Sequence, residues 1–425
     1  MILVFLISLL AFLALSIPIA FSLGLTSAVM LLFMGRMDFI IIPQNLLSGS
    51  DNFALMAIPF FILAGEIMSE GGLSLGIVDF VKSLIGHIRA GLGYVTIVAC
   101  MIFAGISGAA VADTSAIGSV ILPVMKKEGF NVEKSTAIVC AAGTIGPIIP
   151  PSIPMVVMGV VGNVSITKMF LGGIIPGIIT GFLLFFSWYF VTRKDNLKTT
   201  KRASIKDILK YTAKGIPSLM LPVIILGGIL SGVFTCTEAG VVAVVYALVI
   251  SLVFYRTLTF SSLKGIFVRA ARSTSVVMLV VAAATSTAYI ITICQIPKVI
   301  GDFLLAITSS KLGILCAINV LILAVGCVMD VSPAIMILAP ILLPIVTRMG
   351  IDPVYFGVVM VYGLCIGLLT PPVGNVLYVG VGLSKIDFMV LVRNLIPHIM
   401  IYMIVLFLIT YIPDLILWIP NAFYR

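Results

Sequence analysis

Apolar runs of about 20 residues recur from one end of this chain to the other, and each is long enough to cross a bilayer as an α-helix. Only 10% of the residues are charged, whereas soluble domains carry about 25%. The runs do not alternate polar and apolar residues, as the strands of a membrane β-barrel do. The sequence therefore predicts an all-α, multi-pass membrane protein surrounded by membrane lipids.

Two proline-rich motifs interrupt these runs, "GTIGPIIPPSIP" (143–154) and "GLCIGLLTPPVGN" (363–375). Proline removes a backbone donor and clashes with the preceding turn, so it breaks a helix. At membrane depth each freed backbone group needs a new partner. Two further motifs, "GISGAAVAD" (105–113) and "GCVMDVSPA" (326–334), interrupt longer apolar segments. We interpret the proline motifs as breaks in two helices and the glycine motifs as tips of two re-entrant hairpins.

The four motifs belong to an internal repeat. Alignment of Pro150-Pro151 with Pro371-Pro372 gives an offset of 371 − 150 = 221, which also maps Pro123 onto Pro344. Each half then has three spans, an amphipathic arm, a hairpin, a broken helix and a closing span. The three spans lie near 2–17, 18–35 and 53–70 in the first half, and near 215–233, 238–255 and 273–294 in the second. Since a hairpin leaves on the face it entered, each half crosses the membrane five times. An odd number inverts the second half relative to the first.

Charge gives the orientation. The loop 193–214 carries eight Lys or Arg residues and two Asp residues, and basic loops between spans lie on the cytoplasmic side. Threading outward from it places the N-terminus in the periplasm. The excess positive charge is thus a topology signal, and we expect no nucleic-acid partner. The N-terminus lacks a basic region before its first apolar run, so we expect a retained span rather than a cleaved signal.

The sequence gives little support for an enzyme or for a transition-metal site. The seven cysteines lie in or beside apolar runs without a CxxC or Cys/His cluster. The chain has only His87 and His398, no HExxH and no nucleotide-binding GxxxxGK[ST]. We expect a protein that is not an enzyme, although pairing of Asp113 with Asp330 leaves a membrane-embedded enzyme as an alternative.

Inverted repeats with paired broken helices are typical of secondary transporters whose site lies where the breaks meet. Helix N-termini there favour anions, and freed carbonyls can bind Na⁺. Carboxylates at membrane depth are functional candidates by default. Asp113 and Asp330 are such carboxylates, and both sit just after a glycine-rich tip, at similar places in the two halves. We predict no cofactor other than Na⁺ as coupling ion, at two sites related by the repeat. The candidate Na⁺ ligands are Gly105, Ser107, Gly108, Asp113, Thr144, Gly146, Gly326, Asp330, Ser332, Gly367 and Thr370. The candidate substrate contacts are Ser107, Pro150, Ser152, Pro371 and Asn375.

Three segments resemble the large membrane subunit of tripartite ATP-independent periplasmic (TRAP) transporters. They are "IPFFILAGEIM" (58–68), "FAGISGAAVADTSAIGSVILPVM" (103–125) and "AAGTIGPIIPPSIPMVV" (141–157). The resemblance implies an elevator-type transporter in the bacterial inner membrane, with a scaffold and a moving transport domain. It implies Na⁺-driven uptake of an organic acid from a periplasmic binding protein, together with a small membrane subunit. The family's hairpin tip falls on Ser107, Gly108 and Asp113, and Ala109 stands where many members have serine.

The run "GHIRAGLGYVTIVACMIFAGISG" resembles the sialic-acid branch and favours sialic acid over a C4-dicarboxylate. A stand-alone Na⁺/dicarboxylate symporter is the alternative within the transporters. The expected parts are five. They are a first scaffold half with its arm (1–91), a first transport half (92–191), a cytoplasmic basic linker (192–214), a second scaffold half with its arm (215–311) and a second transport half (312–425).

Overall fold

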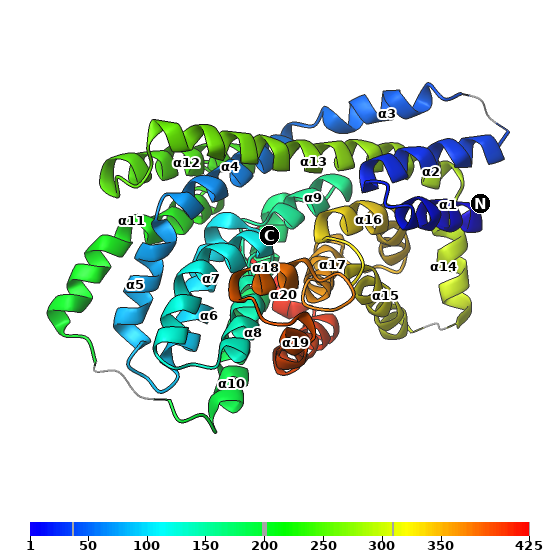
Figure 1. Cartoon of the computed structure of the whole chain (residues 1–425). Coiled ribbons are helices and arrows are strands. Elements are labelled where there is room, and N and C mark those ends of the chain that lie inside the picture. Colours follow the sequence, from blue (N-terminus) through cyan, green and yellow to red (C-terminus); the bar gives the residue numbers. More distant parts are fainter. Residues whose placement is uncertain (36–37, 198–201, 308–309, 425) are drawn as a thin grey trace.

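The computed structural model describes residues 1–35, 38–197, 202–307 and 310–424, and these ranges form helices and connecting loops without a strand (Figure 1). The middle of the predicted basic linker, 198–201, and residues 308–309 after the second arm lie outside the described residues. Within the described ranges, seven helices are long and apolar enough to cross a membrane. The predicted all-α, multi-pass architecture is confirmed.

The elements of the predicted scaffold come from both halves of the chain. The first half supplies α1 (Ile2–Ala14), α2 (Ile19–Phe33), α3 (Ile41–Ser50), η1 (Phe53–Met56), α4 (Ala57–Glu70) and the arm α5 (Leu73–Ile85). The second supplies α11 (Ile205–Leu230), α12 (Cys236–Val249) with the π-helical η2 (Ile250–Phe254), α13 (Phe260–Ile293) and the arm α14 (Ile296–Ile307). Helix α4 packs against α12 and α13, and α2 packs against α13. In Figure 1, α5 and α14 descend from opposite ends of the row formed by α12, α4 and α13, as inverted repeats require.

The hairpins and broken helices occur where the motifs predicted them. The first half has the hairpin α6 (Gly91–Ser107) and α7 (Ala110–Lys127), then the broken helix α8 (Val132–Gly143) and α9 (Ile153–Val161), then α10 (Ile166–Thr192). The second has the hairpin α15 (Lys311–Gly326) and α16 (Val331–Arg348), then α17 (Pro353–Gly367) and α18 (Asn375–Ser384), then α19 (Phe388–Tyr411) and α20 (Asp414–Phe423). Both peptide bonds of the aligned pairs, Pro150-Pro151 and Pro371-Pro372, are cis.

The repeat extends to the caps that start the broken helices. Asn131 precedes α8 and accepts a hydrogen bond from the Lys134 backbone N–H at 2.9 Å. Asp352 lies 352 − 131 = 221 residues later, precedes α17 and accepts from the Val354 N–H at 2.8 Å. A side-chain acceptor at this position satisfies one of the N–H groups that the first helical turn leaves unpaired. Local chemistry therefore fixes the same helix start in both halves.

Helices from the two predicted transport halves pack against one another. Helix α8 packs against α19, and α10 packs against α17. Every residue of α17 from Val354 to Gly367 is buried, and the contacts between halves include buried hydrogen bonds. Tyr402 donates to the Ala141 carbonyl at 2.6 Å, and the Thr180 and Tyr362 hydroxyls lie 2.7 Å apart. The hairpin tips are thus held on a shared core.

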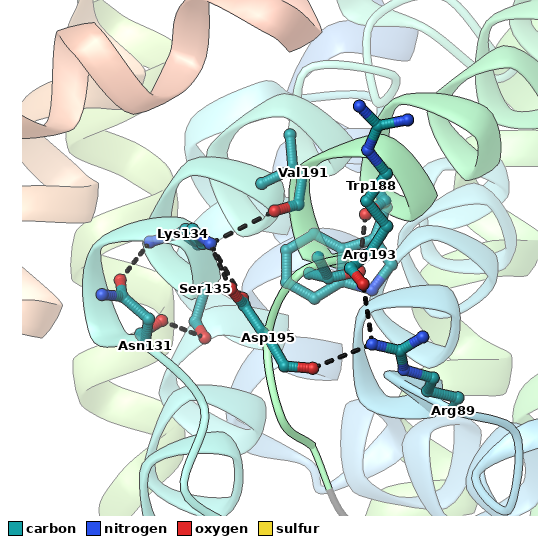
Figure 2. Close-up of polar contacts among 9 residues, drawn as sticks. Arg89, Asn131, Lys134, Ser135, Trp188, Val191, Arg193 and Asp195 are labelled. Carbon is teal, nitrogen blue, oxygen red and sulfur yellow. Dashed lines mark hydrogen bonds and ion pairs between the residues drawn. The ribbon is translucent and has the colours of Figure 1, made fainter.

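A polar cluster ties the first transport half to the end of the α5 arm (Figure 2). Arg89 Nη2 donates to the carbonyl oxygens of Arg193 and Asp195, at 2.8 and 2.9 Å. Lys134 Nζ lies 2.6 and 2.8 Å from the two carboxylate oxygens of Asp195. The buried Trp188 donates from Nε1 to the Ala90 carbonyl at 2.9 Å. These bonds give polar partners to the C-terminal end of α10, where the basic linker begins.

The structure differs from the predicted element boundaries in three places. Helix α11 begins at Ile205, capped by Ser204, so residues 205–214 of the predicted linker are helical. Helix α13 begins at Phe260 rather than near 273, because its basic residues interrupt the apolar run but not the helix. The predicted spans 2–17 and 18–35 are helices of 13 and 15 residues, separated by a turn in which Ser16 has φ 60°. Helices α3 and α20 were not predicted.

Candidate functional site

The first hairpin turns at Gly108, whose φ of 61° lies in the left-handed region that favours glycine. A Cβ at this position would lie 2.4 Å from the Pro151 carbonyl oxygen. The hairpin tip therefore packs with its backbone directly on the broken helix α8–α9. This contact brings together the two motifs of the first half, as predicted.

Asp113 lies one turn inside α7, fully buried beneath this tip. Its Oδ1 accepts a hydrogen bond from the Ser107 hydroxyl, whose oxygen in turn accepts from the Ala109 N–H at 3.2 Å. Among the described residues, Asp113 Oδ2 has no hydrogen-bond partner. This oxygen faces the broken helix, since a Cβ on Gly146 would lie 2.4 Å from it. A buried carboxylate oxygen without a donor is unusual and suits a cation.

The other candidates of the first half bond to local backbone groups or face another helix. Thr144 is buried and donates to the Cys140 carbonyl at 2.9 Å. Ser152 donates to the Pro147 carbonyl at 2.5 Å and caps α9 by accepting from the Met155 N–H at 3.3 Å. Gly105 faces α11, where its Cβ would lie 3.1 Å from Pro222. The hydroxyls of Thr144 and Ser152 thus bond to local backbone groups.

The second hairpin meets its broken helix in a different way. Gly326 and Gly367 are in backbone contact, since a Cβ on Gly367 would lie 2.1 Å from the Gly326 carbonyl carbon. The Val373 N–H donates to the Cys327 carbonyl at 3.1 Å. Asp330 is exposed at the tip, accepts from the Val331 N–H at 2.8 Å and has the Asn375 side chain beside it. Thr370 donates to the Ile366 carbonyl at 2.8 Å.

The two aspartates do not occupy equivalent positions, which corrects the expectation from their similar distances to the glycine motifs. The offset of 221 maps Ala109 onto Asp330 (330 − 109 = 221), and both are N-cap residues of the second hairpin helix. Asp113 maps onto Ala334 and is buried one turn further on. The two hairpin tips therefore offer different donor sets to a ligand.

A cavity of about 540 Å³ is lined by both hairpin tips and by helices α4 and α13. Both tips present helix N-termini to it, from Ala110 of α7 and Val331 of α16. Two helix N-termini at one cavity favour an anionic ligand. The cavity is larger than a water-filled void and of the size that binds small organic molecules.

Of the predicted substrate contacts, Ser107 alone lines this cavity. The predicted Na⁺ ligands Gly108, Asp330 and Ser332 also line it, as does Pro147 of the first proline motif. The lining does not include Pro150, Ser152, Pro371 or Asn375. Sequence reasoning missed the polar scaffold residues that line it, which are Glu66, Ser69, Glu70, Arg269 and Ser273. Charged residues at the edge of apolar runs were the available signal, but such positions are ordinarily interfacial.

This architecture defines a class of protein, an inverted-repeat membrane transporter with paired hairpins and broken helices. A solved structure with the same fold, the YdaH transporter of Alcanivorax borkumensis, matches with a TM-score of 0.66 over 91% of this chain and 90% of that one, at 14% identity. Residues 6–415 match the family model described as the tripartite ATP-independent periplasmic transporter, DctM component. The chain belongs to this family of TRAP transporter large permeases and is not an enzyme.

The relatives carry different substrate names. A putative TRAP transporter large permease of Haemophilus influenzae is 45% identical, over 98% of both chains. The 2,3-diketo-L-gulonate TRAP transporter large permease of Escherichia coli is 44% identical, also over 98% of both. The sialic acid TRAP transporter large permease of Vibrio cholerae is 37% identical, over 96% of this chain and 95% of that one. Family membership alone therefore does not select an acid.

Proposed function

We propose that this chain is the membrane-embedded large permease of a Na⁺-driven importer of organic acids. A periplasmic binding protein delivers the acid, and a small membrane subunit joins the large one in the bacterial inner membrane. The observation that carries the proposal is the cavity between the two hairpin tips, where helix N-termini meet a scaffold wall. An acid group is the ligand that such N-termini favour.

Na⁺ coupling is proposed from the buried Asp113. Its Oδ2 lacks a partner among the described residues and faces the glycine turn of the broken helix. A monovalent cation there would neutralise the carboxylate and use backbone carbonyls freed by the break. A second Na⁺ is proposed between the other hairpin tip and its broken helix, near Asp330, Gly326, Gly367 and Thr370.

An elevator movement of the transport halves past the scaffold is part of this proposal. The hairpin tips would form the moving side of the cavity, and α4 and α13 the fixed side. The cavity reaches the exposed Arg269 and Glu70, at the C-terminal end of α4 where the α5 arm begins. With the basic linker in the cytoplasm and the N-terminus in the periplasm, this conformation faces inward.

The substrate is proposed to be a hydroxylated acid, with 2,3-diketo-L-gulonate and sialic acid ahead of a C4-dicarboxylate. The test is uptake of each radiolabelled acid into proteoliposomes carrying this chain and its small subunit. Uptake that requires both an inward Na⁺ gradient and the binding protein supports the proposal. Uptake without the binding protein would favour a stand-alone Na⁺/dicarboxylate symporter. Uptake that does not depend on the Na⁺ gradient would contradict the proposed coupling to Na⁺.

A further inference from the structure

Arg269 is the one basic residue among the described residues that line the cavity. It lies on helix α13 and lines the same cavity as the hairpin tips. Its side chain is 46% exposed, so solvent and ligands reach it. The acidic residues that line the same cavity are Glu66, Glu70 and Asp330. An anion in this cavity therefore meets one fixed cation and three carboxylates.

The guanidinium of Arg269 is oriented by two carboxylates of α4. Its Nε lies 2.9 Å from Glu66 Oε2, and its Nη2 pairs with Glu70 Oε1. In the described part of the chain neither ion pair involves Nη1. The edge formed by Nη1 and the second Nη2–H thus lies outside both pairs. Such an edge offers two parallel donors that match the two oxygens of a carboxylate.

The three residues all belong to the scaffold, whereas the tips belong to the transport halves. Glu66 and Glu70 are four residues apart on α4, so they lie on one face of that helix. Arg269 therefore keeps its partners whether or not the tips move. An acid held at the tips would meet Arg269 only when the cavity lies between them, as it does in this conformation.

We propose that Arg269 binds the carboxylate of the transported acid on the scaffold wall, through its Nη1/Nη2 edge. This rests on the proposed function and adds an acid-binding residue to it. Glu66 and Glu70 hold the guanidinium in place, and their negative charge weakens its attraction for the acid so that release follows. The competing explanation is that Arg269 only fastens α13 to α4.

Equilibrium binding distinguishes these explanations. The full chain, co-expressed with its small subunit, is purified in detergent and titrated in NaCl with radiolabelled 2,3-diketo-L-gulonate, sialic acid and succinate. Arg269→Gln is expected to weaken binding of the preferred acid by about tenfold or more, since it removes charge-assisted hydrogen bonds to the carboxylate. Glu70→Gln is expected to tighten binding about threefold, since it removes one exposed carboxylate that competes for the guanidinium. If Arg269 only fastened α13 to α4, the Arg269→Gln and Glu70→Gln variants would not change the affinity for the acid in opposite directions.

Arg272→Gln is the matched control, because Arg272 is exposed on the same helix and is not part of the cavity lining. It removes the same charge and is expected to bind acid as the wild type does. Arg269→Lys keeps the positive charge but lacks the edge with two parallel donors, so it should bind the acid more weakly than the wild type. Unchanged affinity in Arg269→Gln would overturn the proposal, as would equal losses in Arg269→Gln and Arg272→Gln. The proposal would also be overturned if the wild type bound none of the three acids. Binding without transport would instead contradict the proposed function and leave the Arg269 comparison intact.

Discussion

The Gly146→Ala variant tests whether the space beside Asp113 holds a cation. The added Cβ would lie 2.4 Å from Asp113 Oδ2, whereas ordinary contact begins at 3.4 Å. The carboxylate or the glycine turn must therefore shift by about 3.4 − 2.4 = 1.0 Å. Gly146 does not have a positive φ, so the substitution adds volume without backbone strain. The change alters no charge, which separates geometry from electrostatics.

The expected loss of Na⁺ affinity in Gly146→Ala follows from the contact that the new methyl group displaces. Overpacking a tight interior costs about 1–3 kcal/mol, and a charge-assisted contact is worth about 1.5–3 kcal/mol. If Asp113 is a Na⁺ ligand, the half-saturating Na⁺ concentration for uptake should rise roughly 10- to 100-fold, as such energies imply. The assay is initial uptake into proteoliposomes at varied Na⁺, and binding of ²²Na⁺ to the purified protein gives the same constant without transport.

Gly24→Ala is the control for this variant. Gly24 lies in α2, and a Cβ added to it would have nothing within 4 Å, so the substitution should leave Na⁺ dependence unchanged. Wild-type half-saturation in a folded Gly146→Ala protein would refute the reasoning, because the methyl group cannot enter the site without moving a ligand. Equal shifts in both glycine variants would show that the effect is not local to Asp113.

Three further outcomes are expected. Asp330→Asn and Ser107→Ala should each lower Na⁺ affinity or transport without blocking membrane insertion, and wild-type Na⁺ dependence would remove that position from the site. Gly367→Ala should abolish transport because its Cβ would lie 2.1 Å from Gly326, whereas Gly382→Ala, with nothing within 4 Å, should transport normally. Trp188→Ala should lower stability by about 3–5 kcal/mol, and Lys134→Met by about 0.2–1 kcal/mol, as measured by thermal unfolding in detergent. Equal melting temperatures for Trp188→Ala and Lys134→Met would contradict the prediction that Trp188→Ala loses more stability.

The sequence by itself determined which segments are apolar helices and where the two proline motifs break them. Apolar length predicts spans because hydrocarbon excludes unpaired backbone groups. Pro150-Pro151 and Pro371-Pro372 interrupt two spans because proline cannot continue the hydrogen-bond ladder. The spacing of 221 residues between these pairs revealed the repeat, and the structure has a hairpin and a broken helix in each half. Helix α13 was predicted too short because an apolar-run criterion stops at a charge, while a helix does not.

The tertiary structure alone decided what each motif faces. Asp113 and Asp330 look alike in sequence, yet within the described residues one is buried without a partner on Oδ2 and the other caps a helix at the cavity. Ser152 and Asn375 have suitable chemistry but do not line the cavity. Glu66, Glu70 and Arg269 come together from α4 and α13, about 200 residues apart in the chain. Their meeting depends on helix packing between the halves, which local sequence patterns do not encode.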